Sequence, residues 1–187
     1  MKKKTKVINL FGGPQSGKST LASAIFYELK MRGLKAEIVN EYIKKWAWRD
    51  QKPGKYDQFF IFGQQGYSES LLYEKVDFIV TDSPLLLIPF YEKKINQTDF
   101  LDDVVRKFMG FANSNGVSYH NFWLKRPLNY DQDGRFHTQI EANQIDTELR
   151  DFLLKRNQSI LDLPKDDKLR IKTVLKEMNV WELPYLD

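Results

Sequence analysis

Cysteine is absent from the 187-residue chain, which excludes disulfide bonds and any metal site built on thiolates. Histidine is scarce too, and its two copies, His120 and His137, have no partners at metal-ligand spacing. A zinc site is therefore not predicted. A chain without disulfides suits a reducing compartment, so we expect a cytoplasmic protein.

Long hydrophobic runs are also absent. The most apolar segment, residues 78–90, contains Asp82 and two prolines and is too short to cross a bilayer, so it predicts a buried strand. The lysine-rich start, residues 2–4, lacks the apolar stretch of a signal peptide. We expect no membrane partner. Hydrophobic residues make up 42% and charged residues 29%, and the length predicts one domain over residues 1–187.

One motif stands out: residues 11–20, FGGPQSGKST, match the phosphate-binding pattern G-x-x-x-x-G-K-[ST]. Its glycines let backbone N–H groups converge on an anion, and a following helix adds its positive end. Lys18 is expected to reach the β- and γ-phosphates of ATP, and the Ser19 hydroxyl to bind Mg²⁺. The predicted cofactors are ATP and Mg²⁺, and the predicted nucleotide-binding residues are Gly12, Gly13, Pro14, Gln15, Ser16, Gly17, Lys18, Ser19 and Thr20.

The segments around this motif have the required pattern. Residues 6–11 are an apolar, β-rich run that leads into the loop, and residues 19–32 have helical periodicity. One helix face carries Leu21, Ala22, Ile25, Phe26 and Leu29. A glycine-rich turn that merely precedes a helix is the alternative, and the strand–loop–helix setting disfavours it.

Strands and helices alternate along the rest of the chain. Strands are predicted at residues 34–40, 76–81, 117–124 and 158–163, and helices at 42–50, 56–75, 98–112, 139–156 and 164–178. This order predicts an α/β fold, a P-loop NTPase three-layer sandwich with a parallel sheet of about five strands. The polar segment around residues 126–138 predicts a lid loop. Ligands of such sheets gather beyond the carboxyl ends of the strands.

Two acidic residues lie at those ends. Asp82 follows the strand at residues 76–81, where P-loop proteins carry the acidic partner of Mg²⁺, although it could also cap a helix together with Ser83 and Pro84. Glu41 follows the strand at residues 34–40 and could accept a proton from a substrate hydroxyl, or be a solvated turn residue.

Basic and aromatic residues complete the candidate site. Arg126 and Arg135 flank the predicted lid and could stabilise charge on a transferred phosphoryl group, whereas surface arginines are also common. Trp46 could stack on a base and Gln64 could hydrogen-bond to its edge. The alternative is that these two residues belong to the packed interior.

The order of these pieces resembles small nucleoside and nucleotide kinases of the P-loop superfamily, most closely the compact kinase-like proteins of bacteriophages. It is similar to deoxynucleoside kinases and to the nicotinamide riboside kinase domain. Deoxynucleoside kinases carry a Glu with a Trp five residues later, and Glu41 and Trp46 have that spacing. The resemblance implies that Glu41 is the general base, that Trp46 lies near the substrate, and that Gln64 or Gln65 contacts the base. The family's Glu-Arg-Ser corresponds to Asp82-Ser83-Pro84, which lacks the arginine.

These observations predict an ATP-dependent kinase that phosphorylates a hydroxyl of a nucleoside-like acceptor. A hydroxymethylated base such as 5-hydroxymethyluracil within phage DNA is an alternative acceptor, which would make DNA a partner and the host cytoplasm the location. A P-loop ATPase or switch without an acceptor is an alternative of another class, as is a nucleic-acid-binding module. The net charge of +4 suits phosphorylated ligands. The oligomeric state stays open, with a homodimer as one option.

Overall fold

Five parallel strands form the centre of the protein, and the computed structural model describes residues 4–126 and 139–186. Their order in the sheet is β2-β3-β1-β4-β5, so the strand that leads into the phosphate-binding motif lies in the middle. The strands are β1 (Thr5–Phe11), β2 (Ala36–Val39), β3 (Phe78–Thr81), β4 (Val117–Trp123) and β5 (Ile160–Asp162). All four pairings are parallel, as the alternating pattern predicts.

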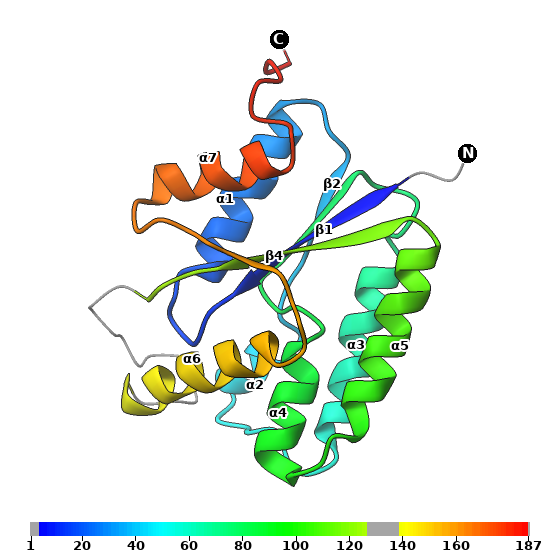
Figure 1. The fold of residues 1–187 in the computed structure, drawn as a ribbon, viewed down its shortest axis with the longest axis vertical. Helices are drawn as coiled ribbons and strands as arrows, with labels where there is room; N and C mark the ends of the chain where they lie inside the picture. Colours follow the sequence, from blue (N-terminus) through cyan, green and yellow to red (C-terminus); the bar gives the residue numbers. More distant parts are fainter. Residues whose placement is uncertain (1–3, 127–138, 187) are drawn as a thin grey trace.

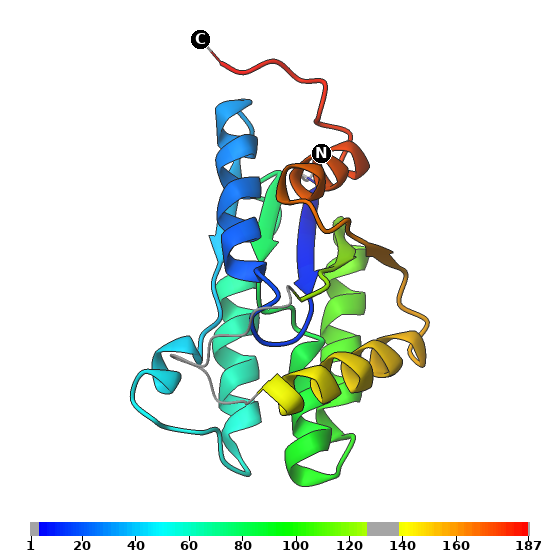
Figure 2. The ribbon, with the colours of Figure 1, turned by 90° about the vertical axis from the view of Figure 1, so that its left-hand side faces the viewer.

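Helices cover both faces of this sheet. Figures 1 and 2 show α1 (Lys18–Met31) and α7 (Asp167–Glu177) on one face. The other face is covered by α3 (Asp57–Ser70), α4 (Leu87–Asn96) and α5 (Phe100–Ser114). The short α2 (Lys44–Ala47) and the longer α6 (Gln139–Leu154) lie beyond the carboxyl ends of the strands, on the same side as the phosphate-binding loop. In the described residues, no helix is long and apolar enough to cross a membrane.

Alternation along β1 builds a core on each face. Ile8 and Leu10 are fully buried in a cluster with α1 and α7, while Phe11 is fully buried in the cluster that holds α4, α5 and α6. The face of α1 predicted from periodicity is confirmed, because Leu21, Ala22, Ile25 and Leu29 are its buried residues. Because β1 is buried on both faces, apolar and polar residues do not alternate along it, and its sequence is an almost continuous apolar run.

The prediction of one buried strand over residues 78–90 is wrong. Only Phe78–Thr81 form strand β3, and Leu87–Asn96 form helix α4. The first four residues of α4, residues 87–90, are all buried, so they show no apolar stripe from which a helix could be predicted. Pro89 lies in the first turn, where the missing N–H costs nothing.

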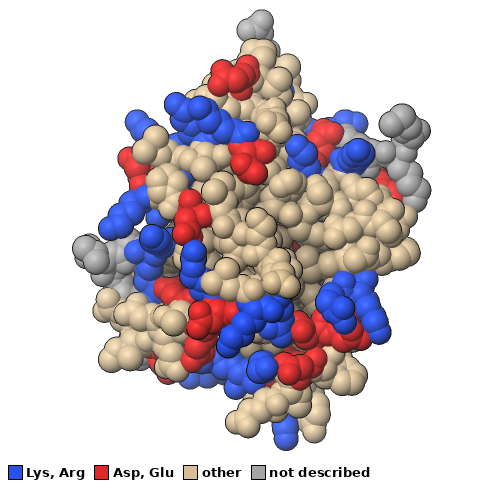
Figure 3. Space-filling view, in the orientation of Figure 1, with Lys and Arg blue, Asp and Glu red and all other residues tan. Residues whose placement is uncertain are grey.

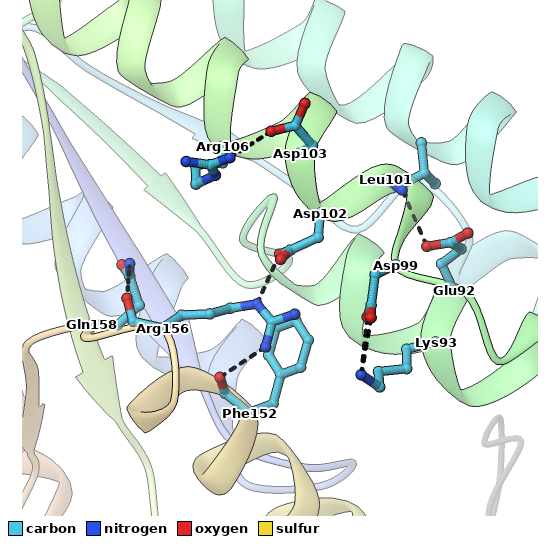
Figure 4. A network of polar contacts seen from close by, with 10 residues as sticks. All are labelled: Glu92, Lys93, Asp99, Leu101, Asp102, Asp103, Arg106, Phe152, Arg156 and Gln158. Atoms are coloured by element: carbon cyan, nitrogen blue, oxygen red, sulfur yellow. Dashed lines mark hydrogen bonds and ion pairs between the residues drawn. The ribbon is translucent and has the colours of Figure 1, made fainter.

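A polar network ties α4, α5 and α6 together (Figure 4). The carboxylate of Glu92 on α4 is buried and accepts a hydrogen bond from the backbone N–H of Leu101 at 3.2 Å. Arg156, just after α6, donates to Asp102 on α5 at 2.7 Å and lies over the ring of Phe152. These contacts fix the carboxyl end of α6, whose other end lies near the phosphate-binding loop.

A buried acid lies on α3, the helix that contacts β2 and α4. Glu69 is fully buried and accepts a hydrogen bond from the hydroxyl of Tyr73, which in turn contacts the Tyr119 hydroxyl at 2.9 Å. The second carboxylate oxygen of Glu69 has no hydrogen-bond partner among the described residues. Burial raises the pKa of Glu69 to about 7, against a smaller lowering effect of the Tyr73 hydrogen bond.

We predict that this acid makes the protein less stable as pH rises. Unfolded Glu69 has the ordinary pKa of 4.5, so the folded state binds the proton more tightly, and stability that is full below pH 4.5 is lost as pH rises through about 7. Between pH 5.5 and 8, the free energy of unfolding should fall by roughly 2 kcal/mol because of this acid, and chemical denaturation should show that this fall is absent in Glu69→Gln. Identical pH dependence in the two proteins would contradict the prediction.

Candidate active site

The phosphate-binding motif folds into the tight loop that its sequence predicts. Strand β1 ends at Phe11 and helix α1 begins at Lys18, after Gly17 with a φ of 89°. This left-handed conformation is costly for residues with a side chain, which explains the glycine. The Lys18 ammonium donates hydrogen bonds to the carbonyl oxygens of Gly12 at 2.8 Å and Gly13 at 3.0 Å. The lysine is thus held along the loop.

Asp82 joins three parts of the site. It immediately follows β3 and is 5% exposed. One carboxylate oxygen accepts a hydrogen bond from the Ser19 hydroxyl, and the other accepts one from the backbone N–H of Glu41 at 3.1 Å. The carboxylate therefore connects the first turn of α1 to the segment after β2. The alternative interpretation of Asp82 as a helix cap has no support here, because α4 begins five residues later without a side-chain cap.

Ser19 and Asp82 together have the chemistry of a Mg²⁺ site. Mg²⁺ in phosphoryl-transfer proteins takes one or two protein oxygens and completes its shell with water and phosphate oxygens. A serine hydroxyl and a carboxylate in contact beside the phosphate-binding loop fit that demand. In the described residues, no group of three His, Asp or Glu side chains is gathered into a larger metal site.

Glu41 is half-buried and lines the same cavity as the loop. Its backbone is held by Asp82, and the next residue, Tyr42, donates its N–H to the side-chain oxygen of Gln65 at 3.2 Å. Gln65 is 2% exposed; its Oε1 makes this backbone contact, and its Nε2 has no hydrogen-bond partner among the described residues. The segment after β2 is therefore fixed from two sides.

A cavity of about 620 Å³ joins these groups. Such a volume suits a nucleotide-sized ligand. Its lining residues from the loop and α1 are Gly12, Pro14, Gln15, Ser16, Gly17, Lys18, Ser19 and Thr20. The other lining residues are Glu41, Ile43, Lys44, Ala47, Lys52, Pro53, Gln58, Asp82, Leu87, Tyr91, Lys94, Ile95, Glu141, Gln144 and Ile145.

Two predicted substrate contacts lie outside this lining. Trp46 is half-buried on α2 and stacks on Phe60, with ring centroids 6.3 Å apart. Gln64 lies on α3 and is also half-buried. The glutamine that does line the cavity is Gln58, at the start of α3, which the sequence pattern did not single out.

Arg126 lies beneath the phosphate-binding loop and is paired with an acid from α6. Its guanidinium donates to the Asp146 carboxylate at 2.5 Å and to the carbonyl oxygen of Ala142 at 2.6 Å. The other oxygen of Asp146 accepts the backbone N–H of Gly13 at 2.5 Å. A Cβ atom at Gly13 would collide with the ends of both side chains, so a larger residue there would displace this ion pair. Arg135, the second predicted arginine, and most of the predicted lid lie outside the described residues.

The sequence analysis missed Asp146. Its only signal is that it lies four residues after Ala142, a fully buried residue on the inward face of α6, where an acid is unexpected. Burial raises the pKa of the Asp146 carboxyl, and the charge of Arg126, the Gly13 hydrogen bond and Lys18 oppose that rise. Burial, then the charges of Glu41 and Asp146, raise the pKa of Tyr91 on α4, so its hydroxyl stays protonated.

No protein-family model matches this chain, and no curated protein sequence matches it. Its fold, however, is similar to solved structures. The Mycobacterium tuberculosis APS kinase CysC in complex with AMPPNP and APS is 14% identical with a TM-score of 0.56, over 95% of this chain and 99% of that chain. Deoxyadenosine kinase from M. mycoides with bound dATP is 18% identical with a TM-score of 0.57, over 92% and 98%.

APE1195 is a third similar structure, 13% identical with a TM-score of 0.54 over 96% of both chains. At these identities the likeness establishes the fold. The fold is the α/β fold of P-loop nucleotide kinases, as the sequence predicts, and the structure adds the strand order 2-3-1-4-5. The solved structures that share it include small-molecule kinases that bind an ATP analogue or dATP.

We predict that Asp146 positions the phosphate-binding loop. Asp146→Ala removes a charged acceptor from the Gly13 N–H, and such hydrogen bonds contribute roughly 1.5–3 kcal/mol, so ATP affinity should fall by about tenfold or more. Asp146→Asn keeps an acceptor and should retain most of the affinity. Calorimetric titration with ATP measures both. Unchanged affinity in the folded Asp146→Ala protein would show that the contact has no role in nucleotide binding.

Proposed function

We propose that this protein is an ATP-dependent kinase that transfers the γ-phosphoryl group to a hydroxyl of a nucleoside-like acceptor. The observation that carries the proposal is the bridging carboxylate of Asp82. It brings a candidate Mg²⁺ pair, Ser19 and Asp82, and a half-buried acid, Glu41, to one cavity with the phosphate-binding loop. Phosphoryl transfer depends chiefly on such positioning and on charge stabilisation.

The proposed reaction uses Glu41 as the general base. The acceptor oxygen forms a bond to the γ-phosphorus of ATP while the bond from that phosphorus to the bridging oxygen of ADP breaks. ADP leaves with the electron pair of the broken bond, and the acceptor's hydroxyl proton passes to the Glu41 carboxylate. Mg²⁺, when bound at Ser19 and Asp82, neutralises charge on the phosphates.

Cationic groups of the chain support the same step. The Lys18 ammonium lies along the loop where the phosphates of a bound nucleotide are expected. Arg126 acts through Asp146 in this proposal, because their ion pair holds the Gly13 N–H. Arg135 stays a candidate for contact with the transferred phosphoryl group.

Other functions are less well supported. A P-loop ATPase without an acceptor would use the same half-buried acid to activate water, so the labelling experiment below, and not the acid, separates the two functions. A nucleic-acid-binding module would be expected to carry a broad basic surface. On the face in Figure 3, lysines and arginines are instead interspersed with acidic residues.

A labelling experiment tests the proposed activity. The protein is incubated with γ-labelled ATP and a panel of nucleosides, nucleotides, nicotinamide riboside and DNA that contains 5-hydroxymethyluracil. We expect label in one acceptor class, and Lys18→Ala should abolish the transfer because it removes the cation at the phosphates. ATP hydrolysis at one rate whatever the acceptor, with no labelled product, would contradict a kinase.

A second variant tests the role of Glu41 as the general base. Glu41→Gln keeps the size of the side chain but cannot accept a proton, so turnover should fall by roughly 10²–10⁴-fold while ATP binding is preserved. The measurements are kcat for phosphoryl transfer and the Kd of ATP. Full turnover in Glu41→Gln, with ATP bound normally, would remove Glu41 from the mechanism.

A further inference from the structure

Two lysines that follow β2 line the cavity. Lys44 on α2 is half-buried and Lys52 lies in the loop between α2 and α3. Within the described residues, neither ammonium group forms a hydrogen bond or an ion pair, whereas Lys94, another lysine in the lining, pairs with Glu148 at 2.5 Å. Lys44 and Lys52 therefore bring positive charge to the cavity that no ion pair with the described residues offsets.

The topology puts both lysines on the acceptor side. Strand β1 and the phosphate-binding loop are central, with β2 and β3 on one side and β4 and β5 on the other. Glu41, Lys44 and Lys52 all follow β2, while Arg126 follows β4. In Figure 2, α2 lies on one side of the loop and α6 on the other. An acceptor that reacts beside Glu41 thus lies next to Lys44 and Lys52.

A buried amide on the same side points independently to a polar ligand. Gln58 is 3% exposed and lines the cavity. Within the described residues its side chain forms no hydrogen bond, so its amide oxygen and N–H₂ group can pair with a ligand in the cavity that offers a donor or an acceptor. Gln65 lies seven residues further along α3; its side-chain oxygen accepts the N–H of Tyr42, while its Nε2 has no hydrogen-bond partner among the described residues.

We propose that the acceptor carries an anionic group, a phosphate or sulfate, that Lys44 and Lys52 bind, while Gln58 hydrogen-bonds to its neutral part. The inference rests on the proposed kinase function and narrows its substrate class. Lysine is a compact point charge that binds such groups without a fixed geometry. Without the lysines, the acids Glu41 and Asp82 in the same lining would repel an anionic acceptor.

Binding experiments test this independently of catalysis. The protein is saturated with AMPPNP and Mg²⁺, so that the nucleotide site is filled, and titrated with nucleosides and their 5′-monophosphates. For at least one base, the monophosphate should bind tenfold or more tightly than its nucleoside. Lys44→Gln and Lys52→Gln should each reduce that preference at least threefold, while Lys55→Gln, an exposed lysine of the same loop outside the cavity lining, should not.

The same pairs are then compared as acceptors of label from γ-labelled ATP. A nucleoside 3′,5′-bisphosphate and a short single-stranded oligonucleotide distinguish a free nucleotide from a polynucleotide as the source of the phosphate. Equal affinity for the neutral and phosphorylated members overturns the anionic site, even if label is transferred. Preferential binding of the monophosphate without any transfer supports the anionic site and contradicts the kinase function instead.

Discussion

The site depends on the register of the parallel sheet. Thr81 at the end of β3 lies level with Asn9 on β1 and with Val39 on β2. The next residue, Asp82, therefore emerges between the phosphate-binding loop and the segment that carries Glu41. From there a single carboxylate can contact both Ser19 and the backbone of Glu41. A one-residue slip of β3 would turn its side chains to the opposite faces and break this connection.

The two sides of the central strand contribute differently. The β2 and β3 side holds Glu41, Asp82 and the lysines Lys44 and Lys52. The β4 side holds Asp146 and Arg126, which contact the loop from α6. Helix α6 also lines the cavity through Glu141, Gln144 and Ile145, and Arg156 ties its far end to α5. A movement of this helix would therefore shift the Gly13 backbone, which Asp146 contacts. The backbone of the phosphate-binding loop at Gly13 and the position of α6 are thus physically coupled.

Local patterns in the sequence were enough to predict a parallel sheet and the phosphate-binding loop. The glycine and lysine spacing of the motif and the buried face of α1 depend on neighbouring residues, so both could be predicted. Helix α4 could not be predicted, because its first four residues are all buried and do not form an apolar stripe on one face of a helix. Asp146 and Gln58 lie far along the chain from the loop and reach the site only through tertiary packing, so spacing does not reveal them.

The central claim is that the loop holds a triphosphate whose last phosphate faces Glu41. A crystal structure with AMPPNP and Mg²⁺ tests it most directly. The account predicts the triphosphate against the backbone N–H groups of residues 14–20, the metal at Ser19 and Asp82, and the γ-phosphate directed toward the Glu41 carboxylate. A triphosphate bound elsewhere, or Glu41 turned out of the cavity, would contradict it.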